Sequence, residues 1–199
     1  MGLMSNSPSD HKRRDKSGPY IPNAAGVVQG ATGAPITLSE RSSIGLALLR
    51  VTAGYLWFQQ LFWKLPPDFA GLHPYLVRES QFTFLPGYSY IIQHIFLPNF
   101  ILLGAGTWTA EFLVSISLMF GLFTRFGGLL STLLAVQLYI GLAYAPGEWY
   151  WTYGMLILLG LFFVTVPAGR RLGVDQWLAP RLQVAAGKSR IARWLSWFV

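Results

Sequence analysis

Two charged residues stand inside apolar stretches of this sequence and are the first candidates for chemistry. Glu111 lies within residues 107–125 (TWTAEFLVSISLMFGLFTR), and Arg50 lies in the first long apolar segment. A charge at the centre of a membrane-spanning helix costs roughly 2.5–3.5 kcal/mol on insertion scales, so each charge needs compensation. Counted at about 1.5 Å per residue, Arg50 lies ~14 Å from the cytoplasmic start of its helix, and Glu111 lies ~18 Å from the cytoplasmic end of its own. We therefore predict an Arg50–Glu111 pair near mid-membrane.

A buried pair of this kind has two interpretations, and the sequence leaves both open. It can fix the register of two helices, which is a structural role. It can also line a cavity in which a polar head group or a proton is handled, with Glu111 and Arg50 as catalytic residues. Further polar and aromatic residues of these two helices and of the third predicted helix are candidates for binding a substrate or a quinone: Trp57, Lys64, Trp108, Gln137 and Arg125.

Other kinds of reactive site receive no support from the residue types present. The chain has no cysteine, which excludes disulfides, thiol chemistry and iron–sulfur ligation. The histidines are His11, His73 and His94, and none lies within a predicted spanning helix. We therefore predict neither a haem nor a metal site. Gln137, taken alone, also fits a simple hydrogen bond between helices.

The composition is that of an integral membrane protein. Of the 199 residues, 53% are hydrophobic and 12% are charged, against about 25% charged residues in a typical soluble domain. The mean hydropathy is +0.43. The net charge of +7 comes from the tails and one short turn rather than from a basic-aromatic surface, so we expect no nucleic-acid partner.

The apolar runs predict four membrane spans at about residues 43–63, 99–123, 126–144 and 149–166. The last three are joined by short connections, which favours an all-α fold with an antiparallel four-helix transmembrane bundle. Residues 68–98 are too polar to span. Within them the stretch YSYIIQHIFL predicts an amphipathic helix on the outer surface.

Lysine and arginine are distributed unequally between the two predicted sides. With the N-terminus inside, only Lys64 and Arg78 lie outside. By the positive-inside rule, both termini are cytoplasmic and the protein is a multi-pass protein of the cell inner (plasma) membrane. We divide the chain into a polar basic tail (1–38), a four-span membrane domain (39–182) and a basic amphipathic helix on the cytoplasmic leaflet (183–199).

Three stretches of the sequence resemble the DoxX/DoxD-like family of membrane proteins. LLRVTAGYLWFQQLFWKL is similar to the first helix of that family, with an early Arg and a distal Lys. AEFLVSISLMFGLFTRFGGLL resembles its second helix, with an inner Glu and a Gly-Leu-x-Thr-Arg turn. VPAGRRLGVDQWLAP looks like the motif that closes its last helix, here a Gly-Arg-x-x-x-x-Asp run of Gly169, Arg170 and Asp175. The resemblance covers about residues 39–182.

The resemblance implies a four-helix membrane protein with a redox-associated function. The family includes the DoxD-like membrane subunit of thiosulfate:quinone oxidoreductase. By resemblance, Arg50, Lys64, Glu111 and Arg125 are the charged positions of the family, a quinone is the cofactor, and a small anion such as thiosulfate is the substrate. No residue here carries electrons itself, so redox work needs a bound cofactor or partner subunit.

Two hypotheses remain open after the resemblance. The first is a quinone-linked oxidoreductase component. The second is a non-catalytic accessory subunit of a larger respiratory or photosynthetic membrane complex, in which the buried pair is structural. Under both hypotheses, the expected partners are the lipid bilayer and other membrane subunits. The sequence does not decide whether the chain is itself an enzyme. A small transporter is disfavoured because no inverted repeat is evident.

Overall fold

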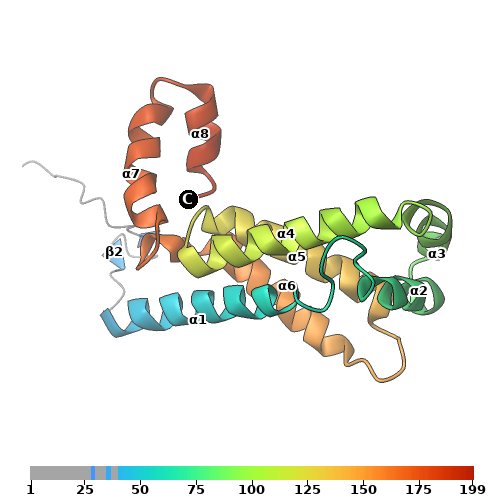
Figure 1. Ribbon diagram of the computed structural model, residues 1–199. Coiled ribbons are helices and arrows are strands. Elements are labelled where there is room, and N and C mark those ends of the chain that lie inside the picture. Colours follow the sequence, from blue (N-terminus) through green and yellow to red (C-terminus); the bar gives the residue numbers. More distant parts are fainter. Residues whose placement is uncertain (1–27, 30–34, 37–39) are drawn as a thin grey trace, which may run out of the picture.

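The computed structural model describes residues 28–29, 35–36 and 40–199 (Figure 1). This part of the chain is helical apart from one short antiparallel pair, β1 (Val28–Gln29) and β2 (Pro35–Ile36). The all-α fold expected from the sequence is therefore confirmed for the described residues. The rest of the polar tail expected over residues 1–38 lies outside them, as does residue 39.

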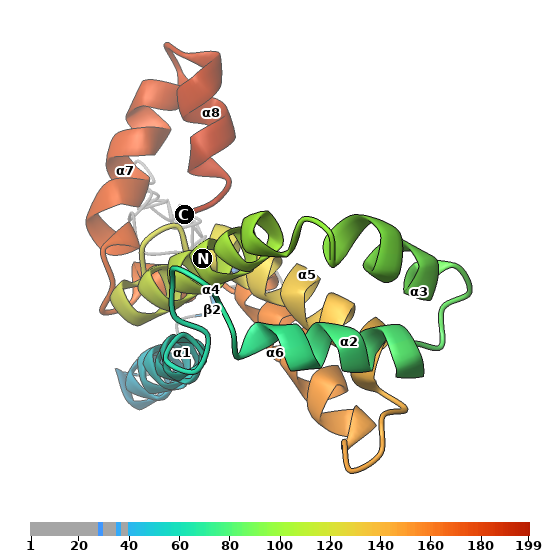
Figure 2. The same ribbon diagram turned by 45° about the vertical axis from the view of Figure 1, so that its right-hand side comes forward.

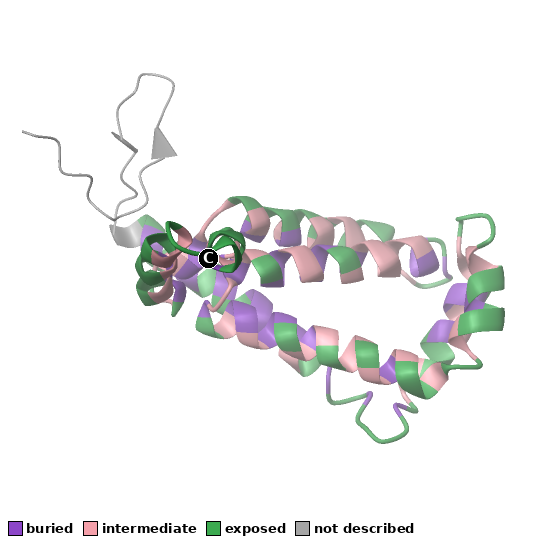
Figure 3. Ribbon diagram, turned by 90° about the horizontal axis from the view of Figure 1, so that it is seen from above, coloured by how far each residue is buried: buried purple, intermediate pink, exposed green. Residues whose placement is uncertain are grey.

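Four long helices form the body of the protein: α1 (Glu40–Gln59), α4 (Phe100–Phe120), α5 (Thr124–Leu142) and α6 (Tyr150–Thr165). They lie side by side in alternating directions, with α1 packed on α4 and α5 packed on α6 (Figures 1 and 3). Among the described residues, two helices are long and apolar enough to cross a membrane, namely α4 and α5. Helix α6 is equally apolar but shorter.

The α5–α6 contact is close because small residues lie where the helices cross. A Cβ atom added at Gly128 would lie 2.8 Å from the carbonyl oxygen of Gly160. A Cβ atom added at Gly160 would lie 2.9 Å from the backbone nitrogen of Thr132. Small residues of this kind allow two helix backbones to approach and gain dispersion energy along their length. The α5–α6 pair therefore has no room for an added side chain at this crossing.

Replacing Gly160 with alanine tests this packing. We expect a loss of about 1–3 kcal/mol in the free energy of unfolding, because the new methyl group must push two backbones apart. The matched control is Gly154→Ala on the same helix, where an added Cβ atom meets nothing within 4 Å. Thermal unfolding in detergent, followed by circular dichroism, should separate the two variants. Equal stabilities would contradict the close approach.

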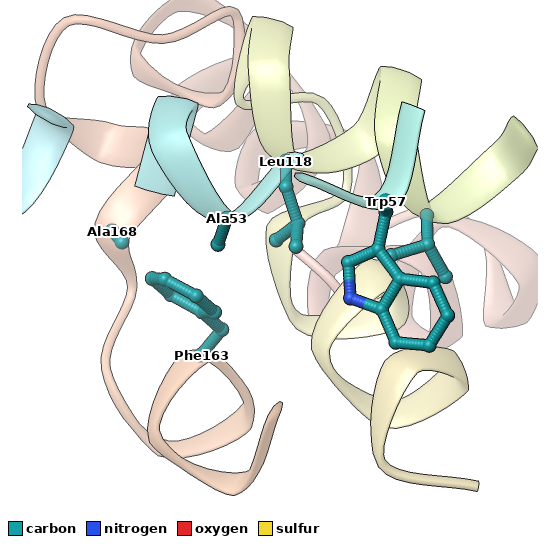
Figure 4. Close-up of a cluster of buried hydrophobic side chains, with 6 residues drawn as sticks. Ala53, Trp57, Leu118, Phe163 and Ala168 are labelled. Atoms are coloured by element: carbon teal, nitrogen blue, oxygen red, sulfur yellow. The ribbon is translucent and has the colours of Figure 1, made fainter. Parts of the chain in front are cut away.

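A cluster of buried apolar side chains joins the two helix pairs near the α4–α5 turn (residues 121–123). We call this end of the bundle the turn end. The cluster contains Ala53, Trp57, Val114, Leu118, Phe163 and Ala168 (Figure 4). It joins α1 and α4 to the end of α6 and to the short 3-10 helix η2 (Ala168–Arg170). The bundle is therefore filled with side chains at this end.

The opposite end is covered by residues 60–99, which we call the cap (Figure 1). The cap contains α2 (Leu72–Phe82), α3 (Tyr88–Ile91) and the π-helical turn η1 (Ile92–Phe96). The last two correspond to the amphipathic helix expected in YSYIIQHIFL. Helix α2 was not expected from the sequence; it packs on α5 and η1 and buries Leu76, Glu79 and Ser80. The cap is thus folded against the bundle.

The C-terminal segment forms a helical hairpin, α7 (Asp175–Ala186) and α8 (Arg190–Ser196), which stands out sideways from the turn end (Figures 1 and 2). Its outer surface exposes Trp177, Val184, Ile191 and Trp194. The boundary predicted between residues 182 and 183 falls inside α7, so the structural division lies earlier, at the start of this hairpin. The chain then returns to the bundle, where Val199 is buried.

Candidate functional site

A cavity of about 690 Å³ lies between the two helix pairs, on the side of the bundle that faces the cap. Its walls come from α1, α2, α4, α5 and α6, and they are mostly apolar. Aromatic side chains are prominent among the lining residues: Trp57, Trp63, Tyr75, Tyr88, Phe96 and Tyr153. An apolar cavity of this size with a few polar groups is typical of a site for a small organic molecule.

One polar group of the cavity is a buried ion pair between Lys64 and Glu111. Lys64 Nζ lies 2.5 Å from Glu111 Oε1, and both residues are 4% exposed. Lys64 reaches this position because α1 ends at Gln59 and the following turns bring the chain back over α4. The other carboxylate oxygen, Glu111 Oε2, is buried and has no hydrogen-bond partner among the described residues. This oxygen is free to accept a hydrogen bond from a ligand.

The Arg50–Glu111 pair predicted from the sequence is wrong. Arg50 is 1% exposed and donates from Nη2 to the carbonyl oxygen of Leu172 at 2.9 Å. The register of α1 on α4 explains the difference, because a Cβ atom at Gly54 would lie 2.6 Å from the backbone nitrogen of Met119. Arg50, one turn earlier, is therefore level with the end of α4. The prediction counted residues from the helix ends and assumed that the ends of both helices lie at the same depth in the membrane.

The second polar group of the cavity is centred on Glu79 of α2. Gln137 of α5 donates from Nε2 to Glu79 Oε2 at 2.6 Å and also to the hydroxyl oxygen of Tyr88 at 3.2 Å. Glu79 is 3% exposed. Burial raises the pKa of the Glu79 carboxyl to about 8, although the bond from Gln137 and the nearby Lys64 both favour its charged form. Gln137 thus lines the same cavity as Glu111, as expected.

A third set of polar contacts joins the cap to the α5–α6 connection beside the cavity. Arg78 Nη1 lies 3.3 Å from Glu148 Oε1, and Arg78 also donates to the carbonyl oxygen of Pro146. Glu148 Oε2 accepts a hydrogen bond of 2.7 Å from the hydroxyl of Tyr153. Each of the two cations of the cap, Arg78 and Lys64, therefore faces a carboxylate.

The turn end holds a separate polar cluster around Asp175, away from the cavity. Asp175 Oδ1 accepts from the backbone nitrogen of Phe123 at 2.7 Å, and Oδ2 accepts from the backbone and the hydroxyl of Thr124 at 2.9 and 2.8 Å. The carboxylate thus caps the first turn of α5, where the helix dipole is positive. The guanidinium of Arg50 lies directly against Gly121, whose φ of +65° and lack of a side chain suit this turn.

This cluster unites two of the motifs that the sequence keeps far apart. The Gly-Leu-x-Thr-Arg turn supplies Gly121 and Thr124, and the Gly-Arg-x-x-x-x-Asp run supplies Asp175. Burial raises the pKa of the Asp175 carboxyl, and its hydrogen bonds with Thr124 and Phe123 and the nearby Arg50 oppose that shift. The contacts made by these residues connect chain segments to one another, which gives the motifs a structural role.

The remaining predicted site residues lie outside the cavity. The indole of Trp108 stacks on Phe112, with ring centroids 5.4 Å apart, and its Nε1 is buried with no hydrogen-bond partner among the described residues. Arg125 donates from Nη1 to the carbonyl oxygen of Trp197 at 3.2 Å and so holds the returning C-terminal segment. The cavity therefore includes Glu111, Trp57, Lys64 and Gln137 of the predicted set and excludes Arg50, Arg125 and Trp108.

Sequence reasoning missed Glu79, Tyr88 and Tyr153. Helix α2 lies in the stretch 68–98, which was predicted only to be too polar to span, and Pro74 falls in its first turn, where proline is tolerated. The spacing of Leu72, Leu76 and Glu79 does follow one helix face and was the available signal. Among the described residues, no three of His, Asp and Glu gather as a possible metal site.

Comparison with protein-family models, with curated proteins and with solved structures gives no match. The DoxX/DoxD-like resemblance therefore continues to rest on the three sequence motifs alone.

Proposed function

We propose that this chain is a four-span, redox-associated membrane subunit that binds a quinone in the cavity between its helix pairs. The membrane part of the proposal is supported by the apolar character of α4, α5 and α6 and by the large apolar residues among the exposed positions of the long helices, which are green in Figure 3. These include Leu48, Leu56, Leu102, Leu133, Leu158 and Leu161. Such faces fit contact with lipid, where apolar side chains need no cover.

The proposed orientation places the turn end in the cytoplasm and the cap outside. The turn end and its hairpin carry many arginines, whereas the cap has the cations Lys64 and Arg78. Both of these face carboxylates within the protein. The basic residues not neutralised in this way are therefore concentrated on one side, as the positive-inside rule requires.

The observation that carries the quinone proposal is the coexistence of two buried polar groups in one aromatic cavity. A quinone ring is flat and apolar, and it bears two carbonyl oxygens on opposite edges. Aromatic walls such as Trp57 favour stacking on the ring. Lys64 provides a donor for one carbonyl, and Glu111 Oε2 can accept from a hydroxyl group of the reduced form.

Binding of a short-chain quinone analogue to the purified protein in detergent tests this proposal. We expect saturable quenching of tryptophan fluorescence, since Trp57 and Trp63 line the cavity. Glu111→Gln should weaken binding of the reduced (quinol) form of the analogue about tenfold or more, because the variant lacks the charged acceptor for its hydroxyl, and a hydrogen bond to a charged group contributes about 1.5–3 kcal/mol. The control is Asp68→Asn, an exposed carboxylate outside the cavity. Absence of saturable quenching, or unchanged binding of the reduced form in Glu111→Gln, would contradict a quinone site.

The small anion implied by the resemblance has less support from the geometry than the quinone. Lys64 and Arg78 were the cations expected to attract it, and each contacts a glutamate. An entering anion would have to displace these carboxylates. The quinone requires no such exchange, and for this reason it is the ligand that we propose.

The accessory-subunit hypothesis is supported by a different observation, the α7–α8 hairpin with its exposed tryptophans. This surface is suited to contact with a neighbouring subunit or with lipid. Purification from native membranes in mild detergent, with mass spectrometry of co-purifying chains and extracted quinones, separates the two hypotheses. Bound quinone with few partners favours the oxidoreductase component, and stoichiometric large subunits without quinone favour the scaffold.

A further inference from the structure

The described residues that line the cavity include more carboxylates than cations. Lys64 is the cation among the described lining residues, while the carboxylates are Glu79, Glu111 and Glu148. Glu148 is paired with Arg78, and Glu111 is paired with Lys64. Glu79 remains, with the neutral Gln137 as its hydrogen-bond partner.

Apart from Lys64, the described residues around Glu79 supply no cation to compensate its charge. Helix α5 presents Gln137, α3 presents Tyr88, and Tyr153 faces it from α6. The π-helical turn η1 carries His94, whose ring stacks instead on the exposed Tyr90, with ring centroids 4.0 Å apart. A buried carboxylate without a cation of its own is more stable when it is protonated.

The position of the Glu79 carboxyl is fixed on two sides. A Cβ atom added at Gly141 of α5 would lie 2.6 Å from Glu79 Cγ, so the helix backbone lies directly against the side chain. Oε2 accepts the bond from Gln137, and no described residue forms a hydrogen bond with Oε1. Oε1 can therefore hold a proton and direct it at a ligand in the cavity.

We propose that Glu79 is the proton-binding residue of this cavity and that its protonated carboxyl donates a hydrogen bond from Oε1 to a carbonyl oxygen of the bound ligand. The hydrogen bond to the ligand rests on the proposed quinone site, whereas the proton-binding role of Glu79 does not. The equilibrium involves one proton, released to water when the carboxyl ionises, and no electron transfer. Because α2 belongs to the cap, the proton is exchanged on the side of the protein that faces away from the turn end.

The raised pKa of Glu79, about 8, supports this assignment. Since the pKa exceeds the ordinary value of 4.5, the folded state binds the proton more tightly than the unfolded chain does. The stability gained in this way is fully present below pH 4.5 and is lost as the pH rises through about 8.

Infrared difference spectroscopy of the ligand-free protein between about pH 6 and pH 10 tests the proton-binding role, because this range brackets the pKa of about 8. We expect the band of a protonated carboxyl to disappear with a midpoint near pH 8 and to be missing in Glu79→Gln. Glu148→Gln is the control and should keep the band. A band that persists in Glu79→Gln, or no transition in the wild type, overturns the proposal.

A second variant keeps the test valid if Glu79→Gln fails to fold. Gln137→Leu removes the hydrogen bond that favours the charged carboxylate, so the midpoint should move to higher pH. An unchanged or lowered midpoint overturns the assignment to Glu79.

The affinity for the quinone analogue, measured against pH, tests the hydrogen bond to the ligand. We expect affinity to fall up to tenfold per pH unit above about 8 and to become independent of pH in Glu79→Gln, whose amide remains a donor. Failure of the analogue to bind at any pH, with the infrared transition intact, overturns the quinone site and leaves the proton-binding role in place. If the affinity of the wild-type protein for the analogue does not change with pH, the proposed hydrogen bond from Glu79 to the ligand is overturned.

Discussion

Replacing Asp175 with alanine is expected to lower the free energy of unfolding by about 3–5 kcal/mol, the cost of removing one partner from a buried charged network. Asp175 is fully buried and accepts three hydrogen bonds, from the backbone of Phe123 and from the backbone and hydroxyl of Thr124. Its loss leaves these donors unsatisfied and removes the negative charge nearest to Arg50. Denaturant titration in detergent, followed by circular dichroism, measures the effect.

The control for this variant is Gln176→Ala, the next residue on the same helix, which is exposed. Its stability should lie within about 0.5 kcal/mol of the wild type. Asp175→Asn should fall between the two, since the amide oxygen can still accept some of the hydrogen bonds. If Asp175→Ala is as stable as Gln176→Ala, the proposed role of this carboxylate in joining α5 to α7 is refuted.

Replacing Lys64 with methionine is expected to destabilise the fold by about 3–5 kcal/mol, because it leaves a buried carboxylate without its cation. Lys64 Nζ and Glu111 Oε1 lie 2.5 Å apart, and both side chains are almost completely shielded from solvent. Methionine keeps most of the volume, so the effect comes from the charge rather than from a cavity. The measurement is again the unfolding free energy in detergent, and the exposed Lys188→Met is the matched control.

The double variant Lys64→Met/Glu111→Gln separates the ion pair from other effects. Removing both charges should recover much of the lost stability, since a buried pair replaced by neutral groups is often close to neutral in energy. The double-mutant cycle should give a coupling energy of about 0.5–3 kcal/mol, the range found for residues in contact. Simple additivity of the two single effects would mean that the pair does not form.

The long helices were well predicted from the sequence, whereas helix α2 and the contacts between the helices were not. Apolar runs and their Gly and Pro boundaries, such as Gly121 and Pro167, are local signals, so three expected spans match α4, α5 and α6 closely. The partner of Glu111 depends on how α1 and α4 are aligned, which is set by the close contact at Gly54. No count along a single helix contains that information.

The cap shows the second limit of the sequence. Lys64 was identified as a candidate binding residue, but it was placed at the far end of a straight helix instead of on a turn that returns to α4. Glu79 lies within residues 68–98, for which the sequence predicted only that the segment is too polar to span. Its importance depends on long-range contacts with Gln137 and Gly141 of α5, which are nearly sixty residues away in sequence.

The separation between the filled turn end and the hollow cap end has a consequence for how such a protein can diversify. The turn end holds the buried cluster and the Asp175 hydrogen bonds, which keep the helices together. The cap supplies Lys64, Glu79 and much of the cavity wall. Substitutions of cap residues other than Lys64, whose ion pair with Glu111 stabilises the fold, can therefore change the size and polarity of the ligand while the turn end stays intact. A protein with this fold can therefore bind a different ligand without a compensating change in the buried cluster at the turn end.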